Sequence, residues 1–131
     1  MDIVTDDRVA AFVSQALDFG LCPPWTCLGI EKSGRVVAGV VFNHFEGHDL
    51  HVTIAGHGWT RRFAQAVGDY VYRQLGCERM TAITEQASIV HIAERMGGQV
   101  EGLLRNHFGP GRDAFVIGIL RDEYRFLEKG E

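Results

Sequence analysis

The chain has 131 residues, of which 46% are hydrophobic and 23% are charged, and its formal net charge is −4. These values are typical of one globular domain, so we predict a single domain over residues 1–131. The acidic balance argues against binding to extended nucleic acid, which usually needs a basic surface. No apolar run approaches the roughly 20 residues of a membrane span and the start has no signal-like pattern, so we expect a cytoplasmic protein with no membrane partner.

The first half of the chain predicts one helix followed by an antiparallel meander. Apolar residues recur at helical spacing over 6–19, where Thr5 would cap the start and Gly20 would follow the end. A break in the apolar pattern at Gly39 predicts a β-bulge in the second of the strands that come next. Three runs separated by Gly-containing turns are expected to be strands, at 25–31, 35–45 and 50–54.

The second half alternates strands and helices. Apolar residues lie three or four positions apart over 59–75, which predicts a long amphipathic helix, and a shorter run predicts another helix near 88–96. The remaining strands are expected at 79–83, 100–105 and 114–121. A meander followed by strand–helix–strand crossovers predicts an α+β fold, with a mixed, mostly antiparallel central sheet flanked by helices.

Two arginines stand at the start of the 59–75 helix, directly after a Gly-His-Gly turn. Arg61 and Arg62 lie where a helix carries a partial positive charge and free N–H groups, which is an unfavourable place for cations. An external anion would offset that charge, and phosphate suits a Gly-flanked turn that ends on a helix start. Side chains that simply point into water would explain the two arginines equally well.

The order of elements from about residue 50 to 127 resembles the GCN5-related N-acetyltransferase (GNAT) family, which transfers an acetyl group from acetyl-CoA to an amine. Residues 94–105 look like the family's E-K/R-L-G-F…EG-x-x-R segment, and residues 113–121 look like its D-x-x-x-x-G-x-L-R final strand. Short domains of this type that phages encode are the nearest likeness. The resemblance implies the GNAT-like acyl-CoA N-acyltransferase fold, acetyl-CoA as donor, and an amine-bearing small molecule or protein as acceptor.

The resemblance also implies where CoA binds. In the family, a turn at the start of the central helix holds the pyrophosphate through backbone N–H groups, and the preceding strand pairs with the pantetheine arm. Gln86 stands where a second anchoring Asn is usual, and Ser88, just after it, could also cap the second helix. The residues implied to bind the cofactor are Val52, Thr53, Ile54, Gly56, His57, Gly58, Trp59, Thr60, Arg61, Arg62, Gln86 and Ser88.

Acetyl transfer needs a base, because most amines are protonated at neutral pH. The candidates are His51, Asp49, His48 and His44. His51 is favoured, since an imidazole titrates near neutrality and the residue lies on the strand that would face the acyl group. The family's usual proton donor to the leaving thiolate is a Tyr in the last helix, and none occurs between residues 84 and 97. Tyr124 could replace it, and solvent could also protonate the thiolate.

Two other classes of function stay open from the sequence. Residues 55–60 depart from the family's longer Q/R-x-x-G-x-G/A loop. This departure and the absent Tyr also fit a GNAT fold that binds CoA or a partner without turnover. Alternatively, four histidines within fourteen residues could bind a metal, namely His44, His48, His51 and His57. No cysteine lies near them, so for the acetyltransferase we expect no metal. An exposed edge strand of the C-terminal hairpin could pair with a second copy, which would make a homodimer.

Overall fold

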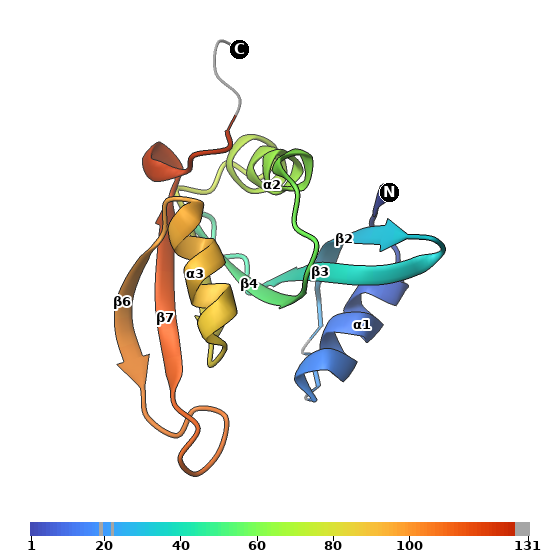
Figure 1. Cartoon of the computed structure of the whole chain (residues 1–131). Coiled ribbons are helices and arrows are strands. Elements are labelled where there is room, and N and C mark those ends of the chain that lie inside the picture. Colours follow the sequence, from blue (N-terminus) through green and yellow to red (C-terminus); the bar gives the residue numbers. More distant parts are fainter. Residues whose placement is uncertain (19, 22, 128–131) are drawn as a thin grey trace.

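Seven strands form one mixed sheet in the computed structural model, which describes residues 1–18, 20–21 and 23–127 (Figure 1). The order across the sheet is β1-β2-β3-β4-β5-β7-β6, and β4 and β5 are its parallel pair. The predicted fold class, a mixed and mostly antiparallel sheet flanked by helices, is confirmed. The strands are β1 (Asp2–Val4), β2 (Thr26–Lys32), β3 (Arg35–Asn43), β4 (Asp49–Gly56), β5 (Arg79–Thr84), β6 (Gln99–Leu104) and β7 (Ala114–Leu120).

Three α-helices flank the sheet: α1 (Asp7–Leu17), α2 (Arg61–Gly68) and α3 (Ala87–Arg95). The long helix predicted over 59–75 therefore begins later, at Arg61, and continues from Asp69–Gln74 as a π-helical segment. A short 3₁₀ turn, Arg121–Glu123, follows β7. None of the described helices combines the length and the apolar character needed to cross a bilayer.

The helices cover the two faces of the sheet unequally (Figure 1). On one face, α1 packs mainly on β2, β3 and β4, around a small apolar cluster that includes Val9, Val13 and Val41. On the other face, α2, the π-helical segment and α3 cover a larger core, which includes Phe42 and Ile117. The face that α1 covers is therefore left open beyond β4, and this is where a site can form.

Close packing of α1 explains two glycines in the meander. Gly29 and Gly39 lie opposite each other in β2 and β3, and a Cβ on either would press against a methyl group of Val9, at 2.6 and 2.8 Å. The β-bulge predicted at Gly39 lies two residues earlier in the same strand, because Ile30 pairs with Ala38 and Glu31 pairs with Val36, which leaves Val37 as the extra residue. Gly39 is needed for the approach of the helix rather than for an irregularity of the strand.

Some predicted helix ends also need correction. Asp6, rather than Thr5, caps α1, since its carboxylate accepts the Arg8 backbone N–H at 3.0 Å. The predicted end of that helix at residue 19 lies outside the described residues. Ser88 is not a cap but the second residue of α3, whose N-cap is Gln86. The strand β1 was not predicted, because three residues carry too short a pattern.

Candidate functional site

The sheet opens in the middle, between its two parallel strands. β4 and β5 pair from Asp49 opposite Arg79 as far as Val52 opposite Ala82. Beyond that point β4 continues to Gly56 paired with β3, and β5 continues to Thr84 paired with β7. Backbone groups of β4 that face this opening have no strand partner, so they are available to a ligand that enters between the strands.

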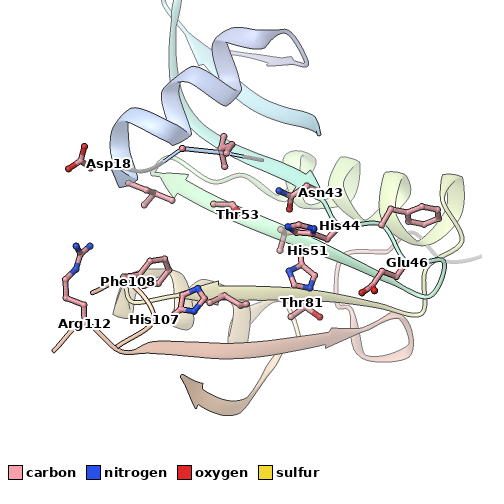
Figure 2. A pocket seen from close by; sticks show the side chains of 16 residues that line it. Asp18, Asn43, His44, Glu46, His51, Thr53, Thr81, His107, Phe108 and Arg112 are labelled. Carbon is pink, nitrogen blue, oxygen red and sulfur yellow. The ribbon is translucent and has the colours of Figure 1, made fainter. Parts of the chain in front are cut away.

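A cavity of about 930 Å³ lies at this opening (Figure 2). Its walls come from β4, β5, the ends of α1 and β3, and the loop between β6 and β7. In Figure 2, Asp18 and Arg112 stand at one end of the cavity and Glu46 at the other. The lining residues are Leu17, Asp18, Gly20, Leu21, Asn43, His44, Phe45, Glu46, His51, Val52, Thr53, Thr81, Ile83, His107, Phe108 and Arg112.

The alternation of side chains along β4 places two of the predicted residues in this cavity. Leu50 and Val52 are 2% and 3% exposed in the core under α2, so the residues between them point to the opposite face. His51 and Thr53 accordingly line the cavity, and Val52 between them also belongs to its lining. The His51 side chain retains 31% of its exposure, which leaves it accessible to a bound molecule.

Asp49 and His51 belong to a chain of polar contacts that crosses three strands. Asp49 Oδ2 lies 3.6 Å from His51 Nε2, and Asp49 Oδ1 accepts a hydrogen bond of 2.7 Å from the Thr81 hydroxyl. Arg79 Nε donates to the same hydroxyl at 3.2 Å, and its Nη2 donates to Glu101 Oε1 at 2.8 Å. This network fixes the Asp49 carboxylate beside the imidazole.

The far end of this network depends on a bulge and a glycine. The register between β6 and β7 shifts between Val100 and Gly102, so Glu101 is the extra residue and its side chain turns across the sheet. A Cβ at Gly118 would overlap both the Glu101 carboxylate and the Arg79 guanidinium. The hydrogen bond to Glu101 also raises the pKa of Arg79, so the guanidinium stays charged.

At the other end of β4, a tight turn leads into α2. Gly56 and Gly58 have φ angles of +101° and +86°, a region that favours glycine, and a Cβ at Gly56 would overlap the Val37 carbonyl. That carbonyl accepts the His57 backbone N–H at 3.2 Å, so this N–H is not free for a ligand. Thr60 caps α2 by accepting the N–H of Phe63 at 3.1 Å.

Other donors at this turn are free. Within the described part of the chain, the backbone N–H groups of Arg61 and Arg62 make no hydrogen bond. The indole Nε1 of Trp59 is buried and has no acceptor among the described residues, an unusual state for a donor. The Arg61 guanidinium lies 5.8 Å from the centre of the Phe126 ring, whereas no such contact involves Arg62 among those residues. The turn therefore fits an anionic ligand.

Gln86 and Ser88 follow the end of β5, the strand on the other side of the opening from β4. Gln86 follows β5, and its backbone N–H donates to the Thr84 hydroxyl at 3.0 Å. Its side chain makes no capping bond to α3, so the amide is available. Ser88 is exposed in the first turn of α3. Neither residue lines the cavity, so their role as CoA anchors stays a prediction from the sequence.

Tyr124 is not brought to the cavity. Its side chain is 6% exposed, its hydroxyl donates to the Ala64 carbonyl, and its ring packs 5.3 Å from that of Tyr72. Burial raises the pKa of Tyr124 above its usual value. The prediction that it protonates a leaving thiolate is contradicted, because the hydroxyl is already used under α2 and does not line the cavity.

The four histidines proposed as a metal site do not gather. The rings of His44 and His51 lie 5.2 Å apart, but His48 and His57 are not with them. In the part of the chain that the structure describes, one group could offer three ligand atoms within 4.8 Å of one another: Glu46, Asp49 and His51. The four-histidine metal site considered from the sequence is therefore wrong, because only His51 of the four belongs to this group.

Comparisons with known proteins support the fold. No protein-family model matches the chain, and no curated protein matches its sequence. A variant of the spermidine N-acetyltransferase SpeG from Vibrio cholerae is similar in structure, with a TM-score of 0.71 at 14% identity over 100% of both chains. The structure of that acetyltransferase with CoA and spermine has a TM-score of 0.70 at 14% identity and covers 94% of this chain and 96% of the other. At this identity the likeness establishes the fold.

Proposed function

We propose that this protein is an N-acetyltransferase that moves an acetyl group from acetyl-CoA to an amine. The observation that carries the proposal is the opening between β4 and β5, with His51 on one wall and the start of α2 at the end of the same strand. A structure with the same fold was solved with CoA and spermine, which supports both the donor and the class of acceptor.

Backbone groups of the chain would hold most of the CoA. Thr53 and Ile54, which follow the last β4–β5 pair, would bind the pantetheine arm with the main-chain groups that face the opening. The free N–H groups of Arg61 and Arg62 would bind the pyrophosphate. Bound acetyl-CoA supplies the acetyl group as an activated thioester.

His51 is the proposed base. Its ring lines the cavity, and it would take the proton of the acceptor amine as the amine nitrogen attacks the acetyl carbon. The Asp49 carboxylate lies 3.6 Å from the imidazole Nε2, and the Thr81 hydroxyl holds that carboxylate in place. Since Tyr124 is used elsewhere, we assign protonation of the leaving sulfur to solvent.

The acceptor would occupy the cavity on the α1 face. Two carboxylates, from Asp18 and Glu46, belong to the lining, while the guanidinium of Arg112 is paired with Glu85. This balance favours an acceptor that carries positive charge, such as a small amine with more than one cationic group. A protein amine is the alternative acceptor. The cytoplasmic location and the likeness to short phage-encoded domains stay predictions from the sequence.

Calorimetry with CoA at low salt, joined to a turnover assay over a panel of amines, tests the proposal. We expect CoA to bind and at least one small polycationic amine to be acetylated. Binding without turnover on any amine would favour the module that binds CoA without catalysis. If millimolar CoA produced no heat of binding and no thermal shift, both functions would be contradicted.

A further inference from the structure

The strand β6 forms an unprotected edge of the sheet. All six of its residues are exposed, and nothing lies beside its outer side in Figure 1. Among the described residues, five of the seven exposed large hydrophobic side chains belong to β6 and its neighbour β7: Val100, Leu103, Leu104, Phe115 and Leu120. Edges of this kind normally carry charges or are covered, because they pair readily with other strands.

We propose that β6 pairs antiparallel with β6 of a second copy, about a two-fold axis that passes through Leu103, so that the two sheets become continuous. The charge that follows the strand favours this direction. A parallel pair would bring the two Arg105 side chains together, whereas an antiparallel pair places them at opposite ends of the interface. Glu101 does not contribute to this choice, because its carboxylate is paired with Arg79 of its own chain. A two-fold interface of this type is self-complementary and closed.

The positions of side chains on β6 fix the register. Gly102 and Leu104 lie opposite Val116 and Ala114 of β7, which places them on one face of the sheet, whereas Leu103 lies opposite Phe115 and faces the other side. With Leu103 on the axis, each Leu104 stands opposite the partner's Gly102. Nothing lies within 4 Å of the position that a Gly102 Cβ would occupy, so the leucine has room there.

On the other face, the two Leu103 side chains would meet across the axis, beside Phe115 of each copy. Leu103 is 53% exposed and Phe115 is 36% exposed, so both have apolar surface left to bury. The regular part of β6 begins after the bulge at Glu101, whose side chain is turned to Arg79. Pairing would therefore rest on Gly102–Leu104 and would leave the contact between Glu101 and Arg79 intact.

Sedimentation equilibrium of the full chain tests this interface. We expect a dimer, and we expect Leu103→Lys to weaken it by about 10–100-fold, because the two lysines would stand directly opposite each other. Leu120→Lys is the matched control, since Leu120 is equally apolar and 38% exposed but lies on β7, away from the outer edge. A monomeric wild-type protein, or a Leu103→Lys variant that dimerises like the wild type, would overturn the proposal.

Cysteine cross-linking tests the register and also decides the matter if Leu103→Lys fails to fold. Cys27 and Cys77 are buried, and a Cys22→Ser background removes the third thiol. A residue on a two-fold axis lies beside its own copy, so Leu103→Cys should form an intermolecular disulfide under mild oxidation. Val100→Cys, which is also exposed but distant from the axis, should not. Equal cross-linking of the two variants would contradict the register, and none at Leu103→Cys would contradict the interface.

Discussion

The two ends of β4 hold their functional groups in different ways. At its start, Asp49 and His51 would act through side chains, and the carboxylate is held by Thr81 from the next strand. At its end, the turn from Gly56 to Thr60 would act through the backbone: two of its glycines have left-handed φ angles, and the N–H groups of Arg61 and Arg62, which follow it, make no hydrogen bond among the described residues. One strand thus connects a site made of side chains with a site made of main chain.

This difference predicts which kinetic quantity each end controls. A side chain at the start of β4 can be changed with little effect on the backbone, so its loss should lower the turnover rate and leave CoA affinity unchanged. A change in the turn should weaken CoA binding, because N–H groups bind only while the backbone keeps its conformation. Variants at the two ends therefore test whether the proposed roles are separate.

The largest effect is expected for His51→Ala. Loss of the base should lower the turnover rate by about 10²–10⁴-fold while CoA affinity stays nearly constant, and the acidic limb of the rate–pH profile should move or vanish. His48→Ala is the matched control, because this exposed histidine is three residues away and does not line the cavity. Equal turnover in the wild type and in His51→Ala would remove the role and make Asp49 or a strand-bound water the next candidate.

At the other end of β4, Arg62→Ala keeps the backbone N–H but removes a guanidinium that would lie beside the pyrophosphate, so it should weaken CoA binding by roughly 1–3 kcal/mol, the scale of a hydrogen bond to a charged group. Arg61→Ala should weaken it less, since that guanidinium lies over the Phe126 ring. Calorimetry at low and high salt measures the CoA affinity of both variants. The loss of affinity relative to the wild type should shrink at high salt, because salt screens the charge of the pyrophosphate. A larger loss for Arg61→Ala than for Arg62→Ala would contradict this arrangement of the turn.

The sequence predicts the backbone end of β4 better than the side-chain end. Glycines with positive φ, a capping Thr and the start of an amphipathic period are local signals, and they lie within a few residues of one another between Gly56 and Arg62. The strands and helices of the second half were predicted for the same reason. Their exact ends were not, since the π-helical turn at Asp69 and the cap at Gln86 depend on tertiary contacts.

The network around Asp49 could not be predicted, because its members come from separate strands. Arg79 and Thr81 lie on β5, and Glu101 lies on β6, 22 residues further along the chain from Arg79. Their contact depends on a one-residue register shift and on the absence of a side chain at Gly118, neither of which leaves a periodic signal. The role predicted for Tyr124 was based on residue type alone. A phenol suits proton donation, but the Tyr124 hydroxyl is packed under α2 and donates to the Ala64 carbonyl.

A smaller effect on turnover is expected from changing the residues that position His51. Thr81→Val removes the hydroxyl that donates to Asp49, so the carboxylate should lose its fixed position and turnover should fall by about tenfold, equivalent to roughly 1.4 kcal/mol. A merely structural role for Thr81 would lower stability without changing CoA-saturated turnover.

No effect is expected from removing metal ions. The ligand atoms of Glu46, Asp49 and His51 lie within 4.8 Å of one another, but a cation held there would occupy the base, and one Asp49 oxygen already accepts from Thr81. Acetyl transfer by the proposed route needs the imidazole free to accept a proton, so the metal-free protein should be the active form. Elemental analysis of untagged protein should find less than about one metal per several chains, and a chelator should leave turnover and melting temperature unchanged. Stoichiometric zinc whose removal lowers both would replace the acetyltransferase proposal with a metal-dependent one at the same three residues.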